Sequence, residues 1–227
     1  SKVNTQASAN DFLTSCKSAT YTVDDVTVKP TKRTPAAPFT TSTLQQEASR
    51  KLGYGVTKTM LLAQKLYESG KITYMRTDSI NLSDTAMGDI KKEVESSYGD
   101  NYYQPRKYKN KNENAQEAHE AIRPTYMNNK TVADEETRRL YELLWRRTIA
   151  SQMSDAAFEK TVAKINISTN KEQLAASGEV LKFDGFLKVY LEGKDDEDDD
   201  DTEGILPPLT AKQQLDFAEM TATEKFS

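Results

Sequence analysis

One short segment of the chain combines side chains that could break and re-form a phosphodiester bond. Residues 72–79 read Ile-Thr-Tyr-Met-Arg-Thr-Asp-Ser, a mixture too short and too varied for a helix. If this segment is extended, Tyr74, Arg76 and Asp78 point to the same side, because side chains alternate along a strand. A tyrosine phenol can attack phosphorus once it is deprotonated or polarised, and a guanidinium can bind the phosphate oxygens and stabilise the added charge. An ordinary strand with a Tyr-Arg-Asp surface face is the alternative that this spacing leaves open.

The single histidine of the chain lies in a second polar segment. His119 stands within residues 116–125, which read Gln-Glu-Ala-His-Glu-Ala-Ile-Arg-Pro-Thr. A histidine imidazole can carry a positive charge beside a phosphate, although a surface or packed histidine fits the same pattern. Pro124 disfavours helical geometry at Arg123, so we expect any helix in this segment to end before that residue.

Helical patterns fill the region around these two segments. Apolar residues recur at helical spacing, with capping residues before them and glycines after several of them. The first expected helix runs from caps at residues 41–43, with Ser42 and Gln45 as a capping box, to about Leu52, and the second runs from near Thr57 to Gly70, with a buried stripe of Leu62, Leu66, Met60 and Ala63. The third runs from Ser83 to Gly99, with Met87, Ile90, Val94 and Tyr98 on one face. The fourth runs from Asp134 to about Met153, with Leu140, Leu143, Leu144 and Ile149.

The two ends of the chain show β patterns instead. Residues 1–38 have little helical periodicity, contain β-prone pieces at 20–23 and 26–28, and end in a proline-rich stretch, 29–38, that we interpret as an extended linker. Near Thr161 the apolar period changes to two, as in Ala163, Ile165 and Ile167. Further strands are expected at Val180–Phe183 and Phe186–Tyr190, with short β pieces over 205–220. The predicted fold is a mixed α and β chain: a β-rich domain (1–38 and 159–227) interrupted by a helical domain (39–158).

Composition restricts the remaining possibilities. The net charge is −4, but the run from Lys194 to Glu203 holds eight acidic residues; outside it lie 30 of the 31 basic and 27 of the 35 acidic residues, a net charge of +3. A mildly basic body is compatible with DNA, and we expect the acidic run to be a mobile, solvated loop. One cysteine, Cys16, and one histidine exclude an internal disulfide and a zinc site of soft ligands. No apolar run of about 18 residues and no signal-peptide core occur, so we expect a cytoplasmic protein.

Aromatic and basic residues interleave in a segment without helical pattern, expected to be a loop over 102–114. Such a mixture can stack bases and neutralise phosphates, and it is also common in plain solvent loops. The residues are Tyr102, Tyr103, Arg106, Lys107, Tyr108, Lys109 and Lys111.

Three blocks of the sequence resemble signatures of the bacterial type IA DNA topoisomerases. Residues 38–48 read Pro-Phe-Thr-Thr-Ser-Thr-Leu-Gln-Gln-Glu-Ala, residues 66–79 end in Ile-Thr-Tyr-Met-Arg-Thr-Asp-Ser, and residues 116–125 read as above. The three occur in the order typical of that family, and the resemblance covers about Lys32 to Phe226. Methionine at position 75 resembles the topoisomerase I branch of the family, whereas the topoisomerase III branch has proline at that position.

The resemblance implies a role for each matching residue. Tyr74 corresponds to the nucleophile that forms a 5′-phosphotyrosine link, Arg76 to the arginine that positions the scissile phosphate, and His119 to the histidine that contacts it. Positions that line or brace the site, and contact DNA, are Gln64, Tyr67, Glu68, Asp78 and Arg123.

The resemblance also implies a larger enzyme of which this chain is a central fragment. In the family, a β arch is interrupted by the helical domain that bears the tyrosine, and that domain swings away to pass a strand. Mg²⁺ is bound by a separate Toprim domain, so no cofactor is expected in this chain. The implied partner is a single-stranded region of negatively supercoiled DNA, and the implied reaction needs no ATP. The resemblance also implies a monomer located in the cytoplasm at the nucleoid. A stand-alone DNA-binding module and an interaction scaffold are the alternatives from other functional classes.

Overall fold

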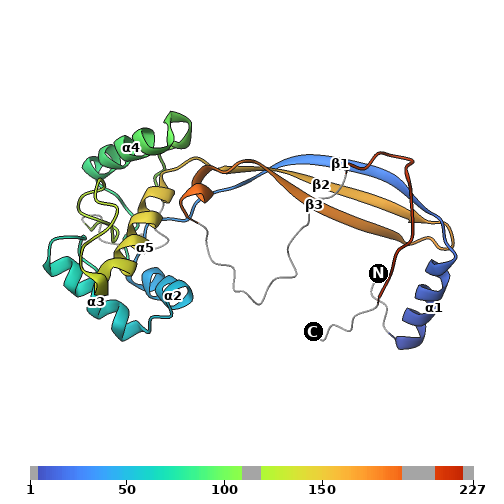
Figure 1. Cartoon of the computed structure of the whole chain (residues 1–227), viewed down its shortest axis with the longest axis horizontal. Coiled ribbons are helices and arrows are strands. Elements are labelled where there is room, and N and C mark those ends of the chain that lie inside the picture. The colour runs from blue at the N-terminus through green and yellow to red at the C-terminus, as the bar shows by residue number, and fades with distance from the viewer. Residues whose placement is uncertain (1–4, 109–118, 191–207, 222–227) are drawn as a thin grey trace. The chain divides into compact units, whose positions relative to one another are not determined.

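The computed structural model describes residues 5–108, 119–190 and 208–221, which form two compact units (Figure 1). The first unit takes its described residues from 1–31, 158–182 and 201–227, and the second from 32–157 and 183–200. The acidic run expected to be mobile, 195–203, lies outside the described residues. Among the described helices, each is too short or too polar to cross a bilayer.

The first unit is built on a four-stranded sheet in the order β3-β2-β1-β4. Its strands are β1 (Tyr21–Arg33), β2 (Ala156–Ile167), β3 (Gln173–Phe183) and β4 (Gln214–Leu215). The predicted two-residue period is confirmed in β2, where Ala163, Ile165 and Ile167 are buried and the residues between them are exposed. The segment expected to be a linker over 29–38 is wrong in part, because β1 continues to Arg33.

A helix in the first unit was not expected from the sequence. Helix α1 (Gln6–Lys17) begins after Thr5, whose side chain accepts a hydrogen bond from the Ser8 amide. One face of the helix packs Phe12 and the free thiol of Cys16 against the sheet residues Tyr21, Ile165 and Ile167. The prediction of little helix in residues 1–38 was therefore wrong: this helix has few apolar residues, and its stability depends on the sheet that it covers.

The described part of the second unit is a bundle of four helices, as the apolar spacing predicted (Figure 1). Helix α5 (Glu135–Ser151) packs against α2 (Thr41–Leu52), α3 (Val56–Glu68) and α4 (Asp84–Tyr98). The core between them consists of side chains that are almost entirely buried, among them Leu44, Leu62, Leu66, Ile90, Leu140 and Leu144. The helical stripes thus lie where the 3.6-residue period placed them.

The start of α2 differs by a few residues from the expected capping box. Thr40, not Ser42, is the N-cap: its hydroxyl accepts from the Thr43 amide while the Thr43 hydroxyl accepts from the Thr40 amide. Thr40 takes this role because its backbone is still extended, at φ −93° and ψ 172°, as an N-cap requires. Ser42 is therefore released from capping and remains exposed in the first turn.

The expected strand at Phe186–Tyr190 is wrong. Residues Gly185–Lys188 form a short 3₁₀ helix, η2; Phe186 within it and Tyr190 just after it are both buried. The turn depends on Gly185, which has φ +50° and approaches another backbone so closely that a Cβ atom there would lie 2.4 Å from the Asp155 carbonyl oxygen. The Phe186 amide donates to the Ser154 carbonyl at 2.9 Å, which holds η2 against the start of β2.

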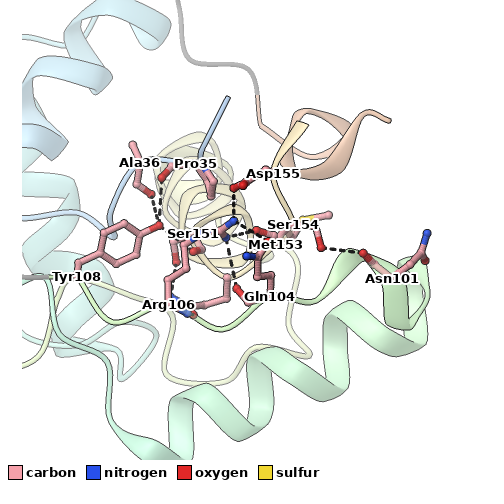
Figure 2. Close-up of polar contacts among 11 residues, drawn as sticks. Pro35, Ala36, Asn101, Gln104, Arg106, Tyr108, Ser151, Met153, Ser154 and Asp155 are labelled. Carbon is pink, nitrogen blue, oxygen red and sulfur yellow. Dashed lines mark hydrogen bonds and ion pairs between the residues drawn. The ribbon is translucent and has the colours of Figure 1, made fainter. Parts of the chain in front are cut away.

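The described part of the aromatic and basic segment has a structural role in the second unit (Figure 2). The Arg106 guanidinium donates to the Met153 carbonyl oxygen and pairs with the Asp155 carboxylate, and its backbone amide donates to Gln152 at 2.8 Å. The Tyr108 hydroxyl donates to backbone carbonyl oxygens on two segments, Pro35 at 3.1 Å and Ser151 at 2.9 Å. This segment therefore fastens the end of α5 to the chain that enters α2.

Candidate active site

The segment that carries Tyr74 and Arg76 is fixed on one side by the start of α2. The Thr41 hydroxyl donates to the Met75 carbonyl oxygen at 2.9 Å and accepts from the Thr77 amide at 2.9 Å. The Thr41 amide in turn donates to the Thr77 carbonyl oxygen at 2.9 Å. One threonine thus binds both residues that flank Arg76 and fixes the position of the Arg76 backbone.

The other side of the segment is fixed by residues 121–125. The Thr73 amide donates to the Arg123 carbonyl oxygen at 2.9 Å, and the Thr73 hydroxyl donates to the Ala121 carbonyl oxygen at 2.7 Å. Ile122 pairs with Phe39 on its far side, so residues 121–125 lie between the tyrosine segment and the entry to α2. Segments about 50 residues apart in the sequence are therefore joined through backbone groups.

Side chains alternate along the segment as the sequence predicted. Met75, Thr77 and Ser79 are buried, whereas Tyr74, Arg76 and Asp78 are exposed. The Tyr74 side chain is 45% exposed, and its ring meets the edge of Tyr67 with the ring centres 5.3 Å apart and the planes at 67°. Edge-to-face contact of this kind orients a ring while its hydroxyl stays accessible to solvent.

An open pocket of about 620 Å³ lies beside the segment at the start of α2. Its lining includes two groups that can bind an anion, the Arg76 guanidinium and the His119 imidazole. The first turn of α2 adds the positive end of a helix dipole, which favours phosphate. The full lining is Thr41, Ser42, Gln45, Arg76, Thr77, Asp78 and His119. Position and charge together make this pocket suitable for a phosphate group.

Glu120 braces the residues next to His119. Its carboxylate accepts from the Ser83 amide at 2.7 Å and from the Arg123 guanidinium at 2.7 and 3.3 Å. Burial by itself would raise the pKa of Glu120, but the hydrogen bonds from Ser83 and Arg123 outweigh that effect and lower the pKa below its ordinary value. Glu120 therefore connects the start of α4 to the segment that carries His119.

A second pocket, of about 470 Å³, lies along the exposed face of α3. It shares Arg76 with the first pocket, so the guanidinium borders both of them. Gln64 lines this second pocket and donates to Glu68 at 2.7 Å, one turn later on the same helix.

Comparison with known proteins assigns the chain to a family. A sequence model described as DNA topoisomerase matches residues 1–227. The chain belongs to the DNA topoisomerase family. It is 45% identical over 235 residues to DNA topoisomerase 1 of Rickettsia typhi, covering 96% of this chain and 30% of the relative. It is 46% identical over 227 residues to the Streptomyces coelicolor protein of that name, covering 95% of this chain and 24% of the relative.

A solved topoisomerase has the same fold. Full-length topoisomerase I from Thermotoga maritima is 30% identical, with a TM-score of 0.74, over 94% of this chain and 35% of that chain. The chain of this DNA topoisomerase family member thus spans about a third or less of the proteins it matches, and the mixed α and β fold expected from the sequence is confirmed.

The structure brings together most of the residues that the topoisomerase resemblance singled out. Arg76, Asp78 and His119 line one pocket, Gln64 and Arg76 line the other, and Tyr67 contacts Tyr74. Neither pocket has Tyr74 in its lining. Arg123 is turned inward, since its guanidinium binds Glu120 and the Pro124 carbonyl oxygen, which suits a brace.

Some lining residues of the topoisomerase pockets were missed by the sequence reasoning. Thr41, Ser42 and Gln45 line the first pocket, although the sequence analysis placed them in a helix start and a signature block without naming them as site residues. The signal was present: a Thr-Ser-Thr run at a helix start brings hydroxyls and the positive end of a helix dipole to one place. Within residues 5–108, 119–190 and 208–221, no group of three or more histidine, cysteine, aspartate or glutamate side chains lies together.

Proposed function

We propose that this chain is the part of a DNA topoisomerase that carries the strand-cleaving tyrosine, Tyr74. The substrate is DNA with a single-stranded region, and the reaction breaks and rejoins one strand to relax negative supercoils. Arg76 and His119 bind the phosphate that is attacked. The observation that carries the proposal is that Arg76 and His119 line one open pocket, while Tyr74 is exposed on the same segment as Arg76.

The proposed reaction exchanges one phosphorus–oxygen bond for another. The Tyr74 hydroxyl loses its proton and its oxygen attacks phosphorus; the bond to the 3′ oxygen breaks, and that oxygen takes up a proton. The product is a 5′-phosphotyrosine link and a free 3′-hydroxyl, and rejoining reverses each step. Because no high-energy bond is lost, the cycle needs no ATP. Arg76 and His119 offset the charge that builds on the non-bridging oxygens during attack.

The remaining side chains have supporting roles in this proposal. Tyr67 orients the Tyr74 ring through its edge contact, and Asp78, which also lines the pocket, offsets part of the positive charge of Arg76. Gln64 and Glu68 extend the polar surface along α3, where DNA would leave the pocket. Arg123 acts through Glu120, as a positioning residue.

We expect the 227-residue chain by itself neither to relax supercoiled DNA nor to accumulate a covalent adduct. Attack by a phenol requires proton removal, protonation of the leaving oxygen and charge stabilisation from more than one side. Arg76 and His119 supply part of this. The rest, including Mg²⁺, is proposed to come from a Toprim domain in the longer, monomeric protein, located with the nucleoid in the cytoplasm.

The test uses the full-length protein that contains this chain. Labelled single-stranded DNA is mixed with the enzyme and the protein is denatured, so that only covalently bound label remains. Tyr74→Phe removes one hydroxyl and should abolish the adduct, whereas Tyr126→Phe, which alters a more exposed tyrosine at 60%, should retain it. Arg76→Ala should slow cleavage by about 10²-fold or more, the scale seen when one charge-stabilising donor is lost.

Two results would contradict the proposal. A covalent adduct on the Tyr74→Phe enzyme would place the nucleophile elsewhere, and peptide mapping would show whether Tyr67 carries the DNA. A stand-alone DNA-binding module predicts instead that Tyr74→Phe changes nothing in any longer protein. It also predicts salt-sensitive DNA binding by the chain alone, which we expect to be weak because the net charge outside the acidic run is only +3.

A further inference from the structure

The exposed face of α3 bears a groove whose lining differs in chemistry from the phosphate pocket. Its walls are made by Thr57, Lys58, Met60, Leu61, Gln64 and Arg76, and its volume of about 470 Å³ is within the range of small-molecule sites. Thr57, Leu61 and Gln64 recur at helical spacing on this face, whereas Thr59, Leu62, Ala63 and Leu66 are buried on the opposite one. The helix thus presents two faces, one for the core and one that includes apolar side chains in solvent.

Leu61 makes this face unusual. Its side chain is 60% exposed at the centre of the outward face, next to the half-buried Met60. Single exposed apolar residues are ordinary on protein surfaces. Here, however, two adjoining apolar side chains line a concavity together with cationic and polar ones. Such a combination of an apolar floor with few polar groups at its edge is typical of a site for a flat, partly polar ligand.

The rim of the groove favours a ligand attached to negative charge. Arg76 borders both the groove and the phosphate pocket, so a molecule in the groove lies next to whatever the pocket holds. Lys58 is held at the rim, with its ammonium 4.1 Å from the centre of the Tyr54 ring. Gln64 uses one side-chain N–H in its bond to Glu68, and an amide has a second N–H and an oxygen that can pair with a base edge.

We infer that this groove binds the nucleobase of the nucleotide adjacent to the phosphate held by Arg76 and His119. The inference rests on the proposed function, because it takes the occupant of the first pocket to be a DNA phosphate. Met60 and Leu61 cover the face of the base, Gln64 pairs with its edge, and Lys58 contacts the next phosphate along the strand. Every base has an apolar face, so the groove accepts a base without requiring one sequence.

The test follows two reporters in solution by NMR, which detects weak binding by the 227-residue chain. His119 is the only histidine of the chain, so its imidazole signals report the phosphate pocket without ambiguity. The Met60 methyl signal, assigned as the one missing in Met60→Leu, reports the groove. Three ligands are compared: a short single-stranded oligonucleotide, oligonucleotides of the same length with one abasic site at successive positions, and inorganic phosphate.

The proposal expects both reporters to shift with the intact oligonucleotide. Inorganic phosphate should shift His119 alone, and one abasic position should abolish the Met60 shift while that of His119 remains. If His119 shifts but Met60 does not, the base site is wrong and the phosphate site stands. If the Met60 shift survives every abasic substitution, the groove contacts the backbone and the inference is also wrong. If neither reporter responds to DNA, the proposal that Arg76 and His119 bind a DNA phosphate is wrong.

A matched pair of variants tests the apolar floor. Leu61→Gln and Val56→Gln make the same change on one helix at residues of nearly equal exposure, 60% and 58%, but only Leu61 lines the groove. Leu61→Gln should weaken oligonucleotide binding by about tenfold, the scale of losing much of a leucine contact. Val56→Gln should change it by less than about twofold. Equal effects of the two variants would show that the groove has no special part in binding.

Discussion

Thr41 is the residue whose removal tests most directly whether the tyrosine segment is held from the α2 side. The perturbation is Thr41→Val, which keeps a branched side chain of similar shape and removes only the hydroxyl. The hydroxyl donates to the Met75 carbonyl oxygen and accepts from the Thr77 amide, both at 2.9 Å. Thr77 is only 9% exposed, so its amide has little access to water once the hydroxyl is gone.

The expected loss follows from these two bonds. A buried amide left without a partner costs about 1–3 kcal/mol, and the donated hydrogen bond contributes about 0.5–1.5 kcal/mol net. We therefore expect Thr41→Val to lower the free energy of unfolding of the helical unit by about 2–4 kcal/mol. Thr41→Ser keeps the hydroxyl and should lose less than about 1 kcal/mol, which separates the hydrogen bonds from simple packing.

Urea unfolding followed by tryptophan fluorescence measures this quantity in the relevant unit. Trp145 is the only tryptophan of the chain; it lies on α5, is 5% exposed and donates to the Met127 carbonyl oxygen. Its signal therefore reports the second unit alone. If Thr41→Val unfolds within about 0.5 kcal/mol of the unmodified chain, the segment is held by something other than Thr41 and the reasoning is refuted.

Two further predictions use the same fluorescence readout. Gly185→Ala should destabilise the helical unit by about 2–4 kcal/mol, because Gly185 has φ +50° and the new Cβ would lie 2.4 Å from the Asp155 carbonyl oxygen. The control Gly88→Ala, whose Cβ would have no atom within 4 Å, should stabilise the unit by about 0.5–1 kcal/mol. An unchanged free energy of unfolding in Gly185→Ala would contradict the close approach. The pKa of Glu120 is lowered in the folded chain, so its contribution to stability is present above the ordinary pKa near 4.5 and is lost as pH falls through the folded pKa. Glu120→Gln should therefore reduce stability at pH 6 and progressively less below about pH 4.5. A stability difference that does not depend on pH would contradict this reasoning.

Where sequence reasoning succeeded in this fold, the local pattern and the tertiary environment agreed. The stripes of α3 and α5 are continuous and lie against each other, so the period alone places Leu62, Leu66, Leu140 and Leu144 in the core. Glycines with positive φ at 53 and 70 follow the helices that they were expected to end. In these cases no information from distant residues was needed.

Where sequence reasoning failed, the fold depended on a contact with residues far away in the sequence. Helix α1 has a polar composition, and its apolar residues Phe12 and Cys16 become a buried face only against strand residues beyond position 160. The run Phe186–Tyr190 is apolar enough for a short strand, and short apolar runs do not distinguish strand from helix. The choice is made by Gly185, whose backbone approaches Asp155 as no residue with a side chain could.

The candidate site divides in the same way. The alternation of Tyr74, Arg76 and Asp78 is a local property and could be predicted. That His119 would lie in the same pocket as Arg76 was implied only by the family resemblance. The local pattern could not show it, because 42 intervening residues separate the two and their placement depends on residues 121–125 pairing with Thr73. The pocket at the start of α2 likewise requires Thr41 to bind a segment more than 30 residues away.

The two-residue period of the tyrosine segment also explains how the exposed groups proposed to be catalytic can be held in fixed positions. The outward positions carry the groups proposed to do chemistry, and the inward positions carry those that fix the backbone. Thr73 bonds to residues 121 and 123, Met75 and Thr77 bond to Thr41, and the Thr77 hydroxyl accepts from the Ser79 amide at 3.0 Å. Charge-stabilising groups accelerate a reaction only if they are in place before the charge develops. Small hydroxyl residues at the inward positions supply these hydrogen bonds, so a segment without regular secondary structure can hold Arg76 in a fixed position beside the start of α2.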